Sequence, residues 1–267
     1  MGDVSEVNLS VRRRQMGESL ALLSSVGPRP HHELGDHYWI AMSGAPSADA
    51  NVAFVEANDP VALRHVVDVI VEIDVPTTLV LAGSALALSD SWQHQGDMPL
   101  MEAPLAVRDV ALDSRVRAAS APDVETVSEL LARAYGIDRD ESDALASFAA
   151  LDHDVGAFWL LEEGSVAVAT VFTAVIGDAV CVWSLATPEE FGRRGHASAL
   201  LNDVLARAYE AGASVGLLAA TPAGEPLYRR AGWQTIETWR MFTRSRGADV
   251  ASHSRPPRQR PSRRVVQ

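Results

Sequence analysis

The stretch that decides the fold runs from Trp183 to Trp233 and reads WSLATPEEFGRRGHASALLNDVLARAYEAGASVGLLAATPAGEPLYRRAGW. It predicts a strand, a turn with glycine and arginine, an amphipathic helix, a second strand, and a short helix that opens near Pro226 and closes at Gly232. The middle helix has one apolar stripe at helical period, and Gly212 follows it as a C-terminal stop. The stripe consists of Ala197, Leu200, Leu201, Val204, Leu205 and Ala208.

The turn before this helix, residues 192–197, places small residues where a ligand can approach the backbone. The helix begins directly after the turn, so the turn lies at the positive end of the helix dipole. The pattern favours an anion site at this turn, such as a site for phosphate. An ordinary glycine-rich helix start is the alternative when the six residues are taken alone.

Two motifs in this stretch resemble the GNAT superfamily of acyl-CoA-dependent N-acyltransferases. Residues 185–197 read LATPEEFGRRGHA and residues 227–233 read LYRRAGW. The family signature is Arg/Gln-x-x-Gly-x-Gly/Ala after a strand, with Tyr-x-x-x-Gly-aromatic further on. Gly192 stands where the family usually has arginine or glutamine, and Arg193 and Arg194 still offer positive charge to a phosphate. The motifs follow the family's order, with a helix and a strand between them.

The resemblance implies a role for each matched position. Backbone groups of Leu185, Ala186 and Thr187 would pair with the pantetheine arm of acetyl-CoA, as an added strand would. The six residues from Gly192 to Ala197 would cradle its pyrophosphate. For the His196 side chain we expect solvent exposure, with a phosphate contact as the alternative. The expected cofactor-binding residues are Leu185, Ala186, Thr187, Gly192, Arg193, Arg194, Gly195, His196 and Ala197.

Tyr228 in the second motif is the expected catalytic acid. A phenol with a pKa near ~10 is protonated at neutral pH and can donate to a departing thiolate. A helix tyrosine that packs on the core is the alternative interpretation. The general base stays open, because strands 179–185 and 215–220 carry no Asp, Glu or His. His153 and Glu162 are candidates, each with a plain surface position as the alternative.

The order of elements on either side predicts an α/β protein in two halves. We expect a GNAT fold in the second half, with a mixed, mostly antiparallel sheet flanked by helices. The first half resembles a degenerate GNAT-like α/β unit of a tandem protein, and an unrelated α/β cap is the alternative. The expected segments are a flexible N-terminus at 1–14, the degenerate α/β domain at 15–107, the acetyltransferase domain at 108–245, and a disordered Arg/Pro-rich tail at 246–267.

Hydrophobic periodicity and turn residues place the individual elements. The run Arg12-Arg13-Arg14 is expected to be a solvated flank. In the first half we expect a helix at 16–23, strands at 37–42, 51–55, 77–81 and about 98–107, and a helix opening at Asp59-Pro60. In the second half we expect helices at 122–135 and 142–150, and strands at 116–119, 158–161, 165–176, 179–185, 215–220 and 236–242.

Length and composition bound the class of protein. The 267 residues are 47% hydrophobic, enough for a large core, and no run approaches the ~20 apolar residues of a membrane span. No apolar segment follows the N-terminal charges, so we expect a cytoplasmic protein. Cys181 is the single cysteine, which excludes an internal disulfide and favours a small buried side chain. Histidine and cysteine show no metal-ligand spacing, so we expect no metal.

The net charge of -12 is unevenly distributed. Seven arginines and one aspartate give residues 244–267 a charge of +6, which leaves -18 on the preceding body. An acidic body suits a cationic acceptor such as an amine. The arginine-rich tail could contact nucleic acid, but no aromatic residue is interleaved with it, so we favour a solvated tail.

The combined sequence features predict an N-acetyltransferase that transfers acetyl from acetyl-CoA to a primary amine by direct attack. The alternative is a non-catalytic CoA-binding or regulatory protein with the same fold. The expected partner is a small-molecule or peptide amine, with no nucleic acid and no membrane, and a homodimer is left open. A longer acyl donor also stays open, and the sequence does not identify the acceptor.

Overall fold

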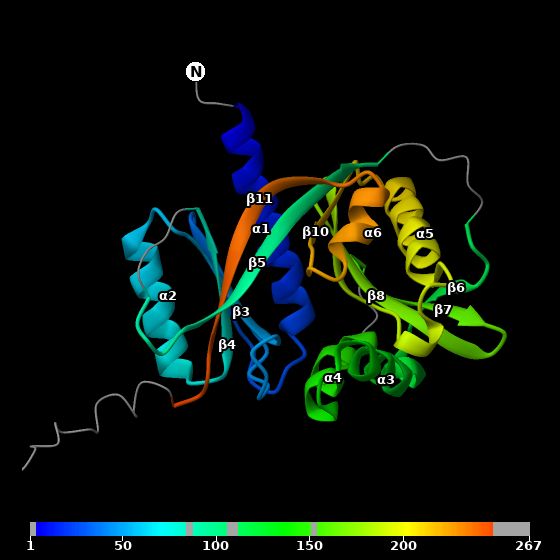
Figure 1. The fold of residues 1–267 in the computed structure, drawn as a ribbon, viewed down its shortest axis with the longest axis horizontal. Coiled ribbons are helices and arrows are strands. Elements are labelled where there is room, and N and C mark those ends of the chain that lie inside the picture. The colour runs from blue at the N-terminus through cyan, green and yellow to red at the C-terminus, as the bar shows by residue number, and fades with distance from the viewer. Residues whose placement is uncertain (1–3, 84–87, 106–111, 151–153, 248–267) are drawn as a thin grey trace, which may run out of the picture.

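The computed structural model describes residues 4–83, 88–105, 112–150 and 154–247 (Figure 1). The chain forms an α/β structure in which helices cover both faces of one sheet. The strands are β1 (His31–Leu34), β2 (Tyr38–Met42), β3 (Asn51–Glu56), β4 (Thr77–Ala82), β5 (Gln93–Pro104), β6 (Val116–Ala118), β7 (Gly156–Glu163), β8 (Val166–Ile176), β9 (Ala179–Ala186), β10 (Val215–Ala219) and β11 (Gln234–Arg244). The helices are α1 (Val4–Ser24), α2 (Pro60–Ile73), α3 (Val124–Tyr135), α4 (Arg139–Ala146), α5 (His196–Glu210) and α6 (Glu225–Arg230).

The eleven strands form a single sheet in the order β1-β2-β3-β4-β11-β5-β10-β9-β8-β7-β6. Among the described strands, only β3 with β4 and β9 with β10 are parallel, and α2 and α5 make these two crossovers. At the centre of the sheet, the last strand of each half, β5 or β11, pairs with strands of the other half. β5 lies between β11 and β10, and β11 lies between β4 and β5. The sheet therefore runs without interruption across the domain boundary expected at 107/108.

Alternation along the strands sorts the apolar side chains between the two faces. Ile40 and Met42 of β2 belong to the cluster beneath α2, whereas Trp39 and Ala41 belong to the cluster beneath α1. This second cluster continues through α3 into the strands of the second half. A third cluster joins α5 and α6 to the opposite face of β8, β9 and β10. One core cluster thus spans both halves, a second lies mainly in the first half, and the third lies mainly in the second half and includes Met101 and Ala103 of β5.

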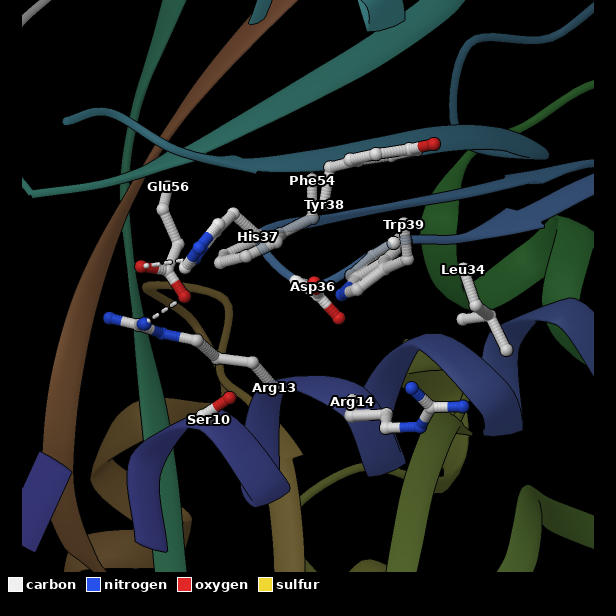
Figure 2. Close-up of a pocket in the computed structure, with 11 residues that line it drawn as sticks. Ser10, Arg13, Arg14, Leu34, Asp36, His37, Tyr38, Trp39, Phe54 and Glu56 are labelled. Atoms are coloured by element: carbon white, nitrogen blue, oxygen red, sulfur yellow. Dashed lines mark ion pairs between the residues drawn. The ribbon is translucent and has the colours of Figure 1, made fainter. Parts of the chain in front are cut away.

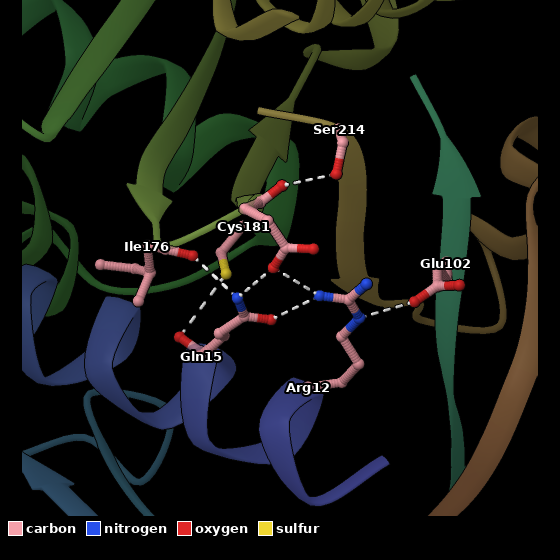
Figure 3. A network of polar contacts seen from close by, with 7 residues as sticks. Arg12, Gln15, Glu102, Ile176, Cys181 and Ser214 are labelled. Atoms are coloured by element: carbon pink, nitrogen blue, oxygen red, sulfur yellow. Dashed lines mark hydrogen bonds and ion pairs between the residues drawn. The ribbon is translucent and has the colours of Figure 1, made fainter. Parts of the chain in front are cut away.

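Helix α1 is the largest departure from the sequence-based expectation. It begins at Val4, where residues 1–14 were expected to be flexible and the helix to start at 16. The expectation of a solvated arginine flank is wrong for Arg12, which is 7% exposed. Its guanidinium bonds Glu102 of β5 at 2.8 Å and Asp178, in the β8–β9 turn, at 2.7 Å (Figure 3). Glu102 lies in the first half and Asp178 in the second, so Arg12 of α1 links the two halves.

A hydrogen-bonded network continues from this arginine into the core. Gln15 donates to Asp178 and to the carbonyl of Ile176, at 2.8 and 2.9 Å (Figure 3). The thiol of Cys181 lies 3.5 Å from the Gln15 carbonyl and is fully buried, which confirms the expected buried position. Burial raises the pKa of this thiol to about 12, so the group stays protonated and inert as a nucleophile.

The other elements follow the sequence closely. Strands β8, β9 and β10 lie within one residue of the predicted ranges, and β1 was not predicted. Strand β5 begins five residues before the predicted strand and ends at Pro104. Its pairing with β11 on one side and β10 on the other explains the extension, because neither partner is visible in the local pattern. The expected tail, 248–267 in particular, lies outside the described residues.

Candidate active site

The parallel strands β9 and β10 separate toward their C-terminal ends. They pair from Ala179 with Val215 to Cys181 with Leu217, while β9 continues to Ala186. Pairing between these two strands ends at that point in the described sheet. The last residues of β9 therefore have an open side that faces the gap, where their backbone groups can meet an extended ligand.

A bulge sets the direction of this end of β9. Pairing with β8 shifts between Phe172–Trp183 and Thr170–Ala186, so Ser184 and Leu185 together face one residue of β8. Ser184 has a φ of 54°, in the left-handed region that a serine rarely adopts. Such a bulge bends a strand and redirects its backbone groups. The site is thus shaped by a strained backbone at the residues where the sequence predicted pantetheine contacts.

Tyr135, the last residue of α3, contacts this bulge and was missed by the sequence analysis. Its hydroxyl donates to the Leu185 carbonyl at 2.9 Å, although 46% of the residue is exposed. Burial raises the pKa of the hydroxyl, and the nearby Tyr228 adds to the effect. The sequence gives no sign of this contact, because the two residues are fifty positions apart.

Gly192 ends the short 3₁₀ turn Glu189–Phe191 that follows β9. An added Cβ there would lie 2.9 Å from the Glu189 carbonyl oxygen, so a larger residue would force the backbone to shift. The Gly192 N–H donates to the same oxygen at 2.9 Å. The tight turn therefore accounts for glycine at the position where the resemblance leads one to expect arginine or glutamine.

Gly195 forms the N-cap of α5 and leaves its first turn open. It has a φ of 84°, and its helix end has no side-chain cap. The first N–H groups of a helix have no partner within the helix, and they form the positive end of its dipole. A Cβ built at Gly195 would meet no atom within 4 Å, so the space in front of the cap is open. Arg193 and Arg194 are exposed beside it.

Two buried polar atoms near this loop have no hydrogen-bond partner among the described residues. They are the Thr187 hydroxyl at the end of β9 and the Nε2 atom of His196 in the first turn of α5. The expectation that His196 is exposed is wrong, since it is 4% exposed and its Nε2 lies 3.6 Å from a Glu163 carboxylate oxygen. Buried polar atoms are normally satisfied, so the unpartnered Thr187 hydroxyl fits a ligand at the end of β9.

Tyr228 lies in α6, the helix that follows β10 across the gap. It is 8% exposed and packs edge-on against Trp233 at 5.8 Å between ring centroids. The side chain is therefore part of the core, as the alternative interpretation expected. Burial also raises its pKa to about 12, which keeps the phenol protonated. Tyr228 also raises the pKa of Tyr135, whose hydroxyl donates to the Leu185 carbonyl.

The general base remains unassigned. Glu162 forms an ion pair with Arg117 at 2.7 Å, and His153 lies outside the described residues. Within the part of the chain that is described, no group of three or more His, Cys, Asp and Glu side chains is arranged to hold a metal. The search for membrane spans over the same residues found no helix both long and apolar enough to cross a bilayer.

Comparison with known proteins identifies the family of the second half. The model of the acetyltransferase (GNAT) family matches residues 124–233. This range includes β9, the 192–197 turn and α6. A search of curated protein sequences found no match.

Solved structures share the fold over nearly the whole chain. A GCN5-related N-acetyltransferase from Kribbella flavida has a TM-score of 0.61 at 16% identity and covers 94% of this chain and 99% of its own. A protein from Novosphingobium aromaticivorans, described as a GNAT-family acetyltransferase, has 0.58 at 16%, covering 88% and 97%. A GCN5-related N-acetyltransferase from Sphaerobacter thermophilus has 0.51 at 14%, covering 88% and 91%. These structures confirm the expected fold class, and the match to the acetyltransferase (GNAT) family model extends over residues 124–233.

Proposed function

We propose that this protein is an acetyl-CoA-dependent N-acetyltransferase whose acceptor is a primary amine. The observation that carries the proposal is the separation of β9 from β10 beside the uncapped start of α5. The gap offers free backbone groups of β9 to an extended chain, and the helix start offers N–H groups to an anion. A molecule with an extended arm and a diphosphate matches both features.

The chain's own groups fit acetyl-CoA at three points. The N–H groups after Gly195 and the adjacent Arg193 and Arg194 would hold the diphosphate. The end of β9, through Leu185 to Thr187, would pair with the pantetheine arm, and the unsatisfied Thr187 hydroxyl would gain a partner. When bound, acetyl-CoA supplies an acetyl group activated as a thioester.

Tyr228 would act as the acid of this reaction. Amide formation joins the amine nitrogen to the acetyl carbon, breaks the carbon–sulfur bond, and leaves a thiolate that takes a proton. A phenol with a pKa near 12 is fully protonated at neutral pH and can donate that proton. The amine would lose its own proton to water, since the described residues of β9 and β10 bring no carboxylate or imidazole into the gap.

The first half would be a second GNAT-like unit without a cofactor site. Its strand–helix–strand segment β3–α2–β4 repeats the order of β9–α5–β10, and the structural likeness to the Kribbella flavida protein extends over 94% of the chain. In this tandem arrangement the first half would contribute β5 to the edge of the second half's sheet and α1 to one face of that sheet. The acetyltransferase unit would then comprise residues 108–245 together with those two elements.

The test is a pair of measurements on the full chain. Calorimetric titration with acetyl-CoA should show one binding site, and CoA release should occur with at least one member of a panel of primary amines. Longer acyl-CoA donors in the same assay would define the donor. Binding without release across the panel would instead support a non-catalytic CoA-binding protein, and absence of binding would exclude both functions.

A further inference from the structure

A small cavity lies in the first half, between α1 and the strands β2 and β3. Its volume is about 100 Å³. Arg13 and Arg14 border it from α1, and Asp36 and Trp39 border it from the β1–β2 turn and β2 (Figure 2). None of its lining residues belongs to the stretch 183–233, so the cavity is separate from the proposed acetyltransferase site.

Trp39 presents an unsatisfied hydrogen-bond donor in this cavity. The residue is 2% exposed, and its indole Nε1 has no hydrogen-bond partner among the described residues. The ring stacks on Phe54 at 5.5 Å and lies against α1 at Gly17, where an added Cβ would come within 2.5 Å of it. The ring is fixed between these neighbours and cannot turn its N–H toward solvent. An indole nitrogen only donates, so the site requires an acceptor.

Asp36, in contrast to Trp39, needs a hydrogen-bond donor. Its exposed carboxylate makes no hydrogen bond or ion pair with any described residue, although the adjacent arginines could have supplied one. Arg13 is already held by Glu56 at 2.5 Å and by Glu237. Arg14 uses its Nε on Glu18 at 2.8 Å and leaves its terminal nitrogens without a partner in the described structure. A carboxylate only accepts, so this wall requires a donor.

We propose that this cavity binds a small zwitterion that carries an ammonium and a carboxylate group, as a small amino acid does. The ligand carboxylate would accept from Trp39 Nε1 and from the terminal nitrogens of Arg14. The ligand ammonium would donate to Asp36. Such charge-assisted hydrogen bonds are stronger than neutral ones, and each would satisfy a group that is otherwise unpaired.

The charges of the wall favour a zwitterion over a simple ion. Two cations, Arg13 and Arg14, face two anions, Asp36 and Glu56, so the lining is close to neutral. A lone anion would meet the two carboxylates, and a lone cation would leave the Trp39 N–H unsatisfied. The volume limits the ligand to a few heavy atoms, and the stacked rings of Trp39 and Phe54 leave little room for a long side chain.

The experiment is an NMR titration of the full-length protein with glycine, without acetyl-CoA, alongside methylammonium and acetate as single-charge probes. Glycine should bind at least about tenfold more tightly than either probe, because only glycine meets both walls. Asp36→Asn and Trp39→Phe should each weaken glycine binding about tenfold or more. Matched controls are Asp68→Asn, an exposed acid of α2, and Trp92→Phe, an indole outside the cavity lining.

Three results would overturn the proposal. They are absence of glycine binding to the wild-type protein, equal affinity for methylammonium or acetate, and unchanged glycine affinity in Asp36→Asn. Asp36 is exposed and has no partner among the described residues, so Asp36→Asn is expected to fold. It therefore decides the case even when Trp39→Phe does not fold. Loss of acetyl-CoA binding does not enter this test, because the titration is made without it.

Discussion

The two parallel strand pairs of this protein, β3–β4 with α2 and β9–β10 with α5, share one topology and differ in what they leave open. In the second half, pairing between β9 and β10 stops at Cys181 and Leu217. In the first half, β3 and β4 pair from Val52 through Glu56, and Ala57 adds a further bond to the Ala82 carbonyl at 2.7 Å. The first pair is therefore closed at the end where the second pair opens.

The helix starts differ in the same way. Asp59 caps α2 by accepting hydrogen bonds from the N–H groups of Val61 and Ala62, and Pro60 brings no N–H at all. Gly195 leaves the first turn of α5 without a side-chain cap. The comparison teaches that the strand–helix–strand unit alone does not make an anion site. The site requires strands that part and N–H groups that no side chain has taken.

The largest effect is expected from a charge at the open helix start. Gly195→Glu should weaken acetyl-CoA binding on the order of 100-fold, because it places a carboxylate against the diphosphate. Gly195→Gln is the matched control, since it has the same size and the same strain at a φ of 84°. Calorimetric titration of both variants separates charge from strain. Equal affinities in the two variants would remove the diphosphate from this turn.

The next effect concerns the proposed acid. Tyr228→Phe should lower kcat on the order of 100-fold while the Kd for acetyl-CoA changes less than about twofold, because only proton donation is lost. The packing against Trp233 is retained by phenylalanine. Tyr209→Phe, in α5, is a control for loss of a phenol elsewhere in the same domain. An unaltered kcat would leave Tyr228 with its core-packing role alone.

A smaller effect is expected from removing the N-cap of α2 in the first half. Asp59→Ala should lower the free energy of unfolding by about 1 kcal/mol, as removal of an N-cap side chain does, with acetyl-CoA affinity and stoichiometry unchanged. Urea denaturation and calorimetry provide the two readouts. Without the cap, the pairing of β3 with β4 still leaves no gap for an extended ligand in the first half. A second equivalent of acetyl-CoA in this variant would show that the cap alone had blocked the first half.

The smallest effect is in the titration of Tyr228. Its pKa near 12 lies above the ordinary value near ~10, so at pH 10 the phenol should remain protonated instead of about half ionised. The stability associated with the neutral phenol is fully present below pH ~10 and is lost as the pH rises toward 12. Difference absorbance between the wild-type protein and Tyr228→Phe measures the ionisation. A midpoint near 10 would contradict a buried phenol.

Much of the second half could be predicted because its signals are local. The apolar stripe of α5, its stop at Gly212 and the runs of β8, β9 and β10 depend on neighbours within a few residues. The first half was less predictable. Its α1 contains charged residues whose partners lie far away in sequence, as with Arg13 and Glu237. A pattern rule therefore assigns such arginines to solvent, and the structure buries Arg12.

The candidate site shows the same division. The residues proposed to line it, Leu185 to Thr187 and Gly192 to Ala197, were predicted from the first of the two short motifs. Three features were not predicted: the contact from Tyr135 to Leu185, the burial of His196 and the crowding at Gly192. The first two depend on neighbours from other elements, and the third depends on the path of the turn itself.

By itself, the sequence determined the α/β class, the family signature and the helix that presents an open N-terminus, because periodicity and glycine placement act over one or two turns. Only the tertiary structure decided which strand pair opens, since register and bulges arise from pairing between distant segments. It alone also decided that β5 and β11 change places at the centre of the sheet. Those long-range pairings join the strands of the two halves into one continuous sheet.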